Sequence, residues 1–566
     1  MRESDETASG SQTMMTSFLR KENCNPARAT KISELIAAAI AQASLPISLV
    51  EEDGFRKLLA YLEPGYKVPC RKTMTAQLHL MYEQKKDSLN KELQDAYSVA
   101  LTTDCWTSMS QEGYMTVTCH FIRDWKHHAF VLDTAPVASF HHSDEEDQEE
   151  ETQGPQRHTA QALSNQLEEV VNQWGLSGKI SAVVHDNASN TKDIGTLSNM
   201  EVTDVGCAAH TLQLSVNKGL DCNSRIKTVV GGAKRLVGHF KHSNVATKAL
   251  ESKQRQMDTP KHRLISSCKT RWNSVFEMLQ RLLENRWPVC SVLSDRQYTK
   301  LSDAQTLDLK SEQWNLMGEL VTCLKPLQVW VILYSTQVAT TVLSAEKNVS
   351  ASIVHPIIRG LVRNHMEPLE ADSAPINELK KVVARDLERR FCSEGEEALT
   401  GPPMLASVLD PRYKHLSFVD EDYRDLPFCA VKEEMAVIIS ATQGQEEPPA
   451  KKTKEASGMD FLLGTSGGSE KSNVDVAAVA QSEFDMYMRS PPLDNATDPM
   501  NWWRDNSKLF PTLSRLAQKF LAIPATSVPS ERVFSAAGNI VNSKRSLLLP
   551  ENVNMLVFLN KMKDQL

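Results

Sequence analysis

Two aspartates follow short stretches that are rich in β-forming residues. Asp104 comes after the stretch that begins at Ser98, and Asp186 comes after the apolar stretch Lys179–His185. If these two strands lie side by side in one sheet, both carboxylates reach the same edge, where hard oxygen ligands suit Mg²⁺. Taken alone, each aspartate is more typical of a helix cap or a turn. The pair together indicates a divalent-cation site.

A third carboxylate is required for the two-metal centres that cleave or transfer DNA strands. Glu531 is the best candidate, because Pro529 and Ser530 are typical of a helix start and place the glutamate in the first turn. A glutamate at that position is also favoured by the helix dipole alone, by about 0.3–1 kcal/mol. Arg532 beside it either binds a phosphate or pairs with an acidic neighbour.

The intervening sequence predicts the elements that must position these acids. Strands are expected over 98–104, 114–122 and 129–134, joined by short links, which is typical of an antiparallel meander. An amphipathic helix follows over 159–174, and a buried strand over 179–185 leads into Asp186. Three antiparallel strands, a helix and a strand that ends in an acid form the opening of a ribonuclease-H-like α/β layout.

Changes in periodicity and composition along the chain predict six segments. Helical periodicity dominates from about residue 222, and a low-complexity stretch rich in Gly, Ser and Lys follows it. We expect a disordered tail over 1–27, an N-terminal helical region over 28–95, the first part of the α/β domain over 96–221, a helical insertion over 222–442, a linker over 443–480 and a C-terminal region over 481–566.

Composition bounds the class of protein. The 566 residues are 41% hydrophobic and 24% charged, as in a soluble protein of roughly three or four domains. The net charge of −8 means that any DNA-binding surface must be a local patch. The 11 cysteines form no C-x-x-C pair, which argues for a reducing compartment and against a structural zinc site. The uncharged run Pro326–Ala345 carries seven Gln, Ser or Thr residues and therefore favours a buried helix over a membrane span.

Six motifs, in this order along the chain, carry a family resemblance. They are Leu101-Thr-Thr-Asp-Cys-Trp-Thr-Ser108, Val184-His-Asp-Asn-Ala-Ser-Asn190, Cys207-Ala-Ala-His-Thr-Leu-Gln-Leu214, Lys269-Thr-Arg-Trp-Asn-Ser274, Leu409-Asp-Pro-Arg-Tyr-Lys414 and Ser527-Val-Pro-Ser-Glu-Arg-Val-Phe-Ser-Ala-Ala-Gly-Asn539. The chain resembles hAT-superfamily transposases, in the branch of transposase-derived zinc-finger BED-domain proteins, over roughly residues 50–566.

The resemblance implies a function for several of these residues. Asp104, Asp186 and Glu531 fall where the family carries its catalytic, metal-binding Asp-Asp-Glu triad, which would hold Mg²⁺ if the protein is catalytic. The implied fold is a ribonuclease-H-like domain that a large all-helical insertion interrupts. The residues expected to contact DNA are Lys269, Arg271, Trp272, His210 and Arg532. Cys207 and His210 match the family's C-x-x-H motif, although by spacing alone a structural role in the sheet is favoured.

The family's N-terminal BED finger finds no match here, because only Cys24 precedes Cys70 and the first histidine is His79. DNA binding then depends on scattered basic residues such as Lys234, Arg235 and Lys241.

The final segment resembles the hAT C-terminal dimerisation region and predicts a homodimer. Its apolar faces either pack on the sheet or pair two chains, and the residues assigned to dimerisation are Trp502, Trp503, Leu556, Phe558 and Leu559. Lys451, Lys452 and Lys454 are read as a nuclear localisation signal, with a solvated charge cluster as the alternative. We expect no membrane partner and no small-molecule cofactor.

Two classes of function remain open. The favoured one is a domesticated, nuclear, DNA- or chromatin-associated regulator of transcription that dimerises. The alternative is an active hAT-type transposase that cleaves and transfers DNA with Mg²⁺ at its Asp-Asp-Glu triad.

Overall fold

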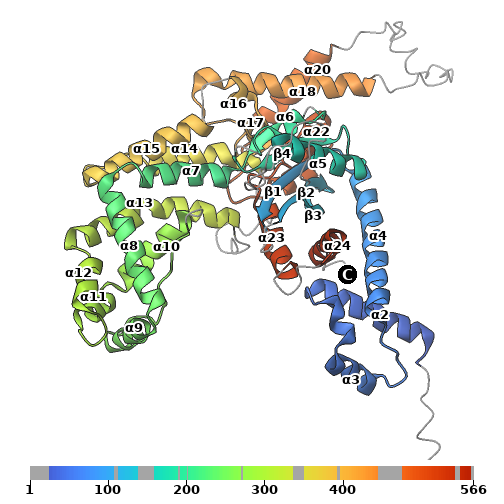
Figure 1. The fold of residues 1–566 in the computed structure, drawn as a ribbon. Coiled ribbons are helices and arrows are strands. Elements are labelled where there is room, and N and C mark those ends of the chain that lie inside the picture. The colour runs from blue at the N-terminus through green and yellow to red at the C-terminus, as the bar shows by residue number, and fades with distance from the viewer. Residues whose placement is uncertain are drawn as a thin grey trace, which may run out of the picture.

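The computed structural model describes residues 24–107, 112–137, 159–188, 191–200, 202–268, 272–335, 350–391, 396–443, 475–541 and 548–562. At its centre lies a five-stranded mixed sheet with the strand order β3-β2-β1-β4-β5 (Figure 1). The strands are β1 (Val99–Thr107), β2 (Gly113–Arg123), β3 (Lys126–Pro136), β4 (Ile180–His185) and β5 (Asp204–Gly206). The protein is therefore of the mixed α/β class.

The first three strands form the antiparallel meander that the alternating sequence predicts. β1 pairs antiparallel with β2, and β2 pairs antiparallel with β3. Arg123 faces Lys126 across a two-residue turn, in which Asp124 and Trp125 both have positive φ, 51° and 56°. This is the geometry of a hairpin turn that matches the twist of the strands.

A helix returns the chain to the other side of β1. The predicted helix is present as α5 (Ala160–Gln173), whose first turn is capped by the Thr159 hydroxyl accepting from the Ala162 N–H at 3.3 Å. The predicted strand is present as β4, which runs parallel to β1. β5 adds a second parallel strand beyond β4 and forms the edge of the sheet.

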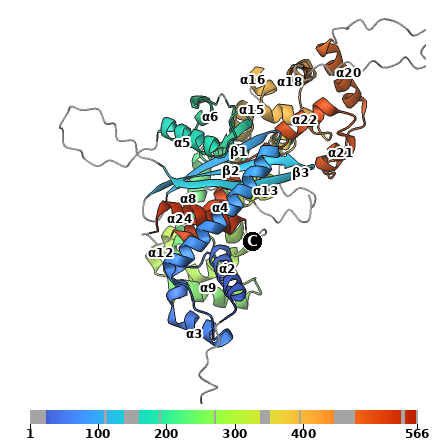
Figure 2. The same cartoon turned by 90° about the vertical axis from the view of Figure 1, so that its right-hand side faces the viewer.

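One face of the sheet is covered by helices from the C-terminal end of the chain, and helices from the N-terminal end pack against these (Figure 2). The N-terminal helices are α2 (Pro26–Gln42), η1 (Ile47–Glu51), α3 (Asp53–Leu62) and α4 (Arg71–Asp95), and the C-terminal ones are α23 (Val528–Ile540) and α24 (Pro550–Lys561). Asn560 of α24 donates to the carbonyls of Ala41 and Gln42 at the end of α2. The two ends of the chain thus share a single apolar core.

A helical lobe projects away from the sheet and has its own core (Figure 1). It contains α7 (Ala208–Leu220), α8 (Ser224–His242), α9 (Asn244–Gln256), α10 (Trp272–Glu284), α11 (Arg286–Ser294), α12 (Leu301–Leu307), α13 (Ser311–Ser335), α14 (Val354–His365) and α15 (Ala374–Phe391). In the chain this lobe lies between β5 and the helix that carries Glu531. None of the described helices is both long and apolar enough to cross a membrane.

A third core joins the other face of the sheet to η2, which precedes α14 in the chain, and to the segments that follow the lobe. Its elements are η2 (Ala351–Ile353), α16 (Glu396–Thr400), α17 (Pro402–Leu409), η3 (Glu421–Tyr423), α18 (Asp425–Gln443), α20 (Val476–Arg489), α21 (Pro499–Asn506) and α22 (Pro511–Phe520). The helix α20 begins at Val476, inside the range predicted to be linker. Lys451, Lys452 and Lys454 lie outside the described residues.

The burial of the C-terminal region corrects the residues assigned to dimerisation. Trp503, Phe558 and Leu559 have no exposed surface, and Leu556 is 2% exposed. Such side chains offer nothing to a second chain, because they already fill the core of their own. Of the five predicted residues only Trp502 is half-buried and presents surface.

One polar contact between α24 and β3 has a pH-dependent consequence. The Asn554 side chain accepts from the Thr134 N–H at 3.1 Å and donates to the Asp133 carboxylate. Burial raises the pKa of Asp133 to about 6, although the Asn554 hydrogen bond and Lys86 act in the opposite direction. The folded state therefore holds a proton that the unfolded chain has already released.

We expect this carboxylate to make stability fall as the pH rises from about 4 to 6, by about 2 kcal/mol. Asp133→Asn keeps an acceptor for Asn554 but cannot ionise, so the variant should lose this slope and be more stable at pH 7. Urea unfolding of both proteins at pH 4.5, 6 and 7.5 measures the difference. Parallel pH profiles of the two proteins would contradict the assignment.

Candidate active site

The sheet register brings Asp104 and Asp186 to the same level of neighbouring strands. β1 and β4 run parallel, with Leu101 opposite Val183 and Thr102 opposite Val184. Two residues further along each strand stand Asp104 and Asp186, and paired strands lie about 4.8 Å apart. Asp104 is still in β1 and is 9% exposed, whereas Asp186 follows the last residue of β4.

Hydrogen bonds attach the start of α23 to β1, although 428 residues separate the bonded side chains in the chain. The hydroxyls of Ser530 and Thr102 lie 2.6 Å apart, and Ser530 also donates to the Thr102 carbonyl at 3.1 Å. Thr102 and Asp104 point to the same face of the strand, because side chains alternate with a period of two. Glu531, next to Ser530 in the first turn of α23, is thereby brought to the Asp104 side of the sheet.

Cys207, at the start of α7, holds the residues that lead into α23. Its Sγ accepts from the Ser527 N–H at 3.4 Å, and the Ala208 N–H donates to the Ala525 carbonyl at 3.1 Å. Cys207 is buried, and its own N–H donates to the His185 carbonyl at 2.7 Å. The cysteine of the C-x-x-H motif thus joins β4, α7 and the approach to α23.

The electrostatics of Asp104 show that the three acids influence one another. Burial raises the pKa of Asp104, and the negative charges of Glu531 and Asp186 raise it further, to about 8. Negative charge is therefore concentrated at this end of β1. The His210 imidazole of α7 also lies here, with its Nδ1 3.9 Å from the Asp186 carboxylate.

The donor chemistry fits a divalent cation, since the carboxylates that act on one another here supply hard oxygen ligands. The ligands are not already assembled, however. Within the described ranges no three His, Cys, Asp or Glu side chains are grouped closely enough to hold a metal ion. Glu531 and Asp186 both act on the pKa of Asp104, and metal binding by the three carboxylates stays a prediction.

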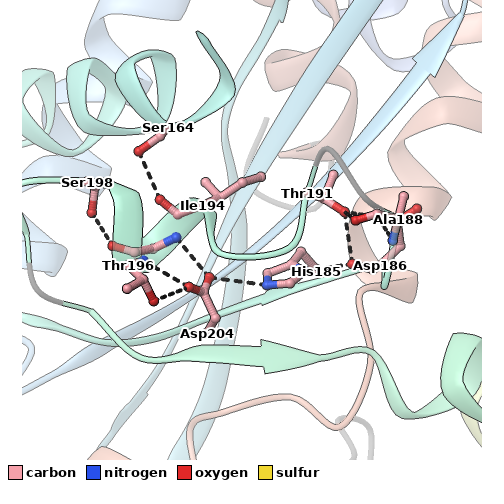
Figure 3. A network of polar contacts seen from close by, with 10 residues as sticks. Ser164, His185, Asp186, Ala188, Thr191, Ile194, Thr196, Ser198 and Asp204 are labelled. Atoms are coloured by element: carbon pink, nitrogen blue, oxygen red, sulfur yellow. Dashed lines mark hydrogen bonds and ion pairs between the residues drawn. The ribbon is translucent and has the colours of Figure 1, made fainter. Parts of the chain in front are cut away.

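A hydrogen-bonded network behind Asp186 holds the end of β4 in place (Figure 3). His185 donates from Nδ1 to the Asp186 carbonyl at 2.6 Å, and its Nε2 lies 3.1 Å from the Asp204 carboxylate. Burial lowers the pKa of His185, but these two hydrogen bonds outweigh burial and raise it overall. An imidazolium with both nitrogens donating is the state that satisfies both oxygens.

Asp204 in turn organises the short helix α6 (Ile194–Leu197). Its carboxylate accepts from the N–H groups of Gly195 and Thr196, each at 2.8 Å, and from the Thr196 hydroxyl at 2.7 Å (Figure 3). Burial raises its pKa, but His185 and these donors lower it overall. The Thr191 hydroxyl donates directly to the Asp186 carboxylate. The loop after β4 is thus tied down at both ends.

The other residues expected to contact DNA are placed unevenly. Lys269 and Arg271 lie outside the described residues, and Trp272 is the first residue of α10, with a side chain that is not described. Arg532 lies in the first turn of α23, and its carbonyl accepts from Lys561 at 2.9 Å. His210 lies beside Asp186, with its Nδ1 3.9 Å from that carboxylate.

Sequence reasoning missed the residues that position the acids. Thr102 and His185 had been read only as parts of motifs, and Ser530 only as part of a helix start. The available signal was their occurrence inside the same motifs as the acids: Thr102 two residues before Asp104, Ser530 directly before Glu531 and His185 directly before Asp186.

Known families match three stretches of the chain. Residues 483–562 match the hAT family C-terminal dimerisation region, residues 205–323 the ZBED1 RNase-like helical domain, and residues 102–150 the ZBED1 RNase-like domain. These stretches contain the strand of Asp104, the helix of His210 and the helix of Glu531.

Whole-chain similarity agrees with these matches. The chain is 26% identical to human zinc finger BED domain-containing protein 4, over 94% of this chain and 43% of that protein. It is 27% identical to the putative AC transposase of Zea mays, over 92% of this chain and 63% of the relative. It is 24% identical to the putative transcriptional regulator tpeD of Talaromyces stipitatus, over 93% of this chain and 61% of the relative.

The chain spans less than two thirds of the length of each of these relatives. Its three matching stretches follow the order β1, helical lobe and C-terminal helices, and the relatives cover nearly its whole length. These matches and relatives together support a hAT-derived protein similar to the BED zinc-finger family.

Proposed function

We propose that this protein is a transposase-derived nuclear regulator that associates with DNA or chromatin and acts as a homodimer. The observation that carries the proposal is the match of residues 483–562 to a dimerisation region, in a chain whose relatives include BED-finger proteins and a putative transcriptional regulator. Nuclear import through Lys451, Lys452 and Lys454 is part of the proposal.

The proposed architecture is a ribonuclease-H-like domain interrupted by a helical insertion. Support comes from the strand order, with three antiparallel strands followed by two parallel ones. Further support comes from α23, which returns to β1 only after the helical lobe. In this arrangement the C-terminal region completes the domain rather than forming a separate unit.

A genetic replacement separates regulation from catalysis. In cells whose endogenous copy is removed, wild type and the double variant Asp104→Asn/Glu531→Gln are expressed at equal levels. Chromatin occupancy and transcript changes are then measured. A regulator that does not use the carboxylates should restore the same transcripts in both forms. Rescue by wild type alone would refute the regulatory proposal in favour of catalysis.

A second function, metal-dependent DNA cleavage and strand transfer, is favoured by the charge at Asp104. The pKa of this carboxyl reaches about 8 through burial and through the nearby charges of Glu531 and Asp186. Acids that raise one another's pKa in this way are more common at functional sites than in purely structural positions.

In this second function Asp104, Asp186 and Glu531 would hold Mg²⁺, which polarises a phosphoryl oxygen and supplies a nucleophilic water. The chain itself would hold the ligands rigid. Ser530 and Cys207 fix the approach to Glu531, and His185 fixes the Asp186 end of β4. His210 stands on the Asp186 side, where it can bind a DNA phosphate.

A cation should stabilise the wild-type chain by neutralising these acids. At a concentration 100-fold above its dissociation constant, a ligand adds about 2.7 kcal/mol. We expect Mn²⁺ to raise the melting temperature of wild type and to leave that of Asp104→Asn unchanged. Without the cation, Asp104→Asn should be the more stable protein at pH 7.5, because wild type must either bury the charge of Asp104 or take up a proton there on folding.

Differential scanning fluorimetry at pH 7.5 with 0 to 10 mM MnCl₂ or MgCl₂ tests this expectation. Asp193→Asn serves as the control, because Asp193 is an exposed aspartate of the same region with a positive φ of 70° that asparagine also adopts. Equal cation shifts in wild type and Asp104→Asn would refute binding at the three acids. A cleavage assay on hairpin and linear DNA with the same proteins tests the chemistry.

A further inference from the structure

The helix α8 carries an unusual exposed face. Lys227, Gly231, Lys234, Gly238 and Lys241 recur at spacings of four and three residues, which places all five on one side of a helix. The three lysines are exposed, and the opposite side of α8 is packed into the core of the lobe. Lysine and glycine thus alternate along about four turns of helix surface.

The two glycines have no packing reason to be glycine. A Cβ on Gly238 would meet no atom within 4 Å, and a Cβ on Gly231 would meet only the Arg235 guanidinium at 3.7 Å. Gly232 differs, because a Cβ there would come within 2.8 Å of Leu309. Glycine weakens a helix interior relative to alanine. Its retention on an open face is explained by a ligand that approaches the backbone closely.

The surroundings of this face are strongly basic. Between Ser224 and Cys268 the sequence has ten Lys and Arg residues and two acidic residues, in a chain whose net charge is −8. Within the described residues, neither Lys234 nor Lys241 has a carboxylate within 4 Å of its ammonium group. Lys227 alone of the three has an acidic neighbour, Asp221 at 4.0 Å, and both of these side chains are largely exposed.

A hollow of about 450 Å³ continues the face at its C-terminal end. Val237 and Phe240 of α8 line it from one side together with Lys241, and Lys261 and Arg263 line it from the loop after α9. Glu251 of α9 also lines the hollow, so that the cations on both walls outnumber its one carboxylate. The helical lobe that contains α8 projects away from the sheet (Figure 1).

We propose that this face of α8, with the hollow at its end, binds the phosphate backbone of duplex DNA outside the carboxylate centre. The lysines supply point charges, and the glycines let the backbone come close to the helix. Affinity of this kind depends on released counterions and carries little sequence preference. The inference rests on the proposed association with DNA and adds the surface that provides it.

Two double variants of the full-length chain test the proposal by fluorescence anisotropy, with a 30-base-pair duplex of arbitrary sequence in EDTA. Lys234→Ala/Lys241→Ala should weaken binding by about tenfold at 0.1 M salt and reduce the slope of log K against log salt by about 2. Gly231→Gln/Gly238→Gln should also weaken binding while its melting temperature stays equal or rises, because glutamine is the better helix former. Weaker binding by a variant that is at least as stable as wild type cannot be explained by unfolding of the variant.

Lys57→Ala/Lys381→Ala is the matched control, since it removes two exposed lysines from α3 and α15 and should leave binding unchanged. If both α8 variants bind the duplex as tightly as wild type does, this inference is overturned and the proposed DNA association still stands. Failure of wild type to bind the duplex at all would overturn both. A tenfold preference of wild type for an RNA duplex of the same sequence would overturn the assignment to DNA.

Discussion

Asp410→Ala is expected to destabilise the chain by about 3–5 kcal/mol, because it leaves a buried arginine without its counter-charge. The Asp410 side chain has no exposed surface, and that of Arg412 is 3% exposed. The two form a bidentate pair, with contacts of 2.9 and 2.7 Å, and the Ser352 hydroxyl donates to the same carboxylate at 2.8 Å. Every acceptor position of this acid is thus used inside the protein.

The pair stands where three segments distant in sequence meet. Ser352 belongs to η2, and the neighbouring Ala351 N–H donates to Ile523 on the approach to α23. The Leu409 carbonyl accepts from the Trp503 indole at 2.9 Å, which attaches α21 to the same point. Loss of Asp410 should therefore loosen the C-terminal region and, with it, the position of Glu531.

Chemical denaturation followed by tryptophan fluorescence measures the loss. The control is Asp410→Leu/Arg412→Met, which removes both charges and should recover much of the stability. An Asp410→Ala protein that unfolds at the same urea concentration as wild type would show that the pair contributes nothing. Recovery in the double variant would confirm that the cost comes from the orphaned arginine.

Sequence alone predicted the local elements well, because periodicity reports which residues are buried on each side of a strand or helix. The meander of β1 to β3, the helix α5 and the strand β4 are all local patterns. Asp104 and Asp186 could be paired on this basis, since both follow strands. The link from Glu531 to β1 depends on Ser530 meeting Thr102, which no local pattern reports.

The same limit explains the error at the C-terminus. Apolar residues that recur every three or four positions on α21 and α24 show that one face of each helix is buried. They do not show whether the covering surface belongs to the same chain. Here Trp503 is covered by Tyr487 and Phe558 by Tyr82 and Trp174. A dimer must therefore use apolar side chains that the chain leaves exposed.

Exposed apolar residues do occur in the region that matches the dimerisation family. Met486 is 46% exposed and Leu509 55% exposed, and each adjoins a residue that packs on the half-buried Trp502. Tyr487 lies edge-on to Trp502 at 5.7 Å, and Phe510 stacks on it at 5.8 Å. This surface of α20, α21 and the link from α21 to α22 is the one that we expect to pair two chains.

Phe558→Asp and Leu509→Asp should therefore have opposite effects. A charge at Phe558 stands in a sealed core, so that the expected cost is at least about 4 kcal/mol and the chain should fail to fold. A charge at Leu509 is exposed to solvent in the monomer but would be buried at the interface in the dimer. The Leu509→Asp chain should therefore fold normally but remain monomeric, because the free energy of dimerisation weakens by about 2 kcal/mol. Sedimentation velocity at micromolar concentration, with circular dichroism as the folding control, distinguishes the two results. If Phe558→Asp gives a folded monomer, the dimer interface includes α24 after all. A Leu509→Asp protein that sediments as wild type does would remove this surface from the interface.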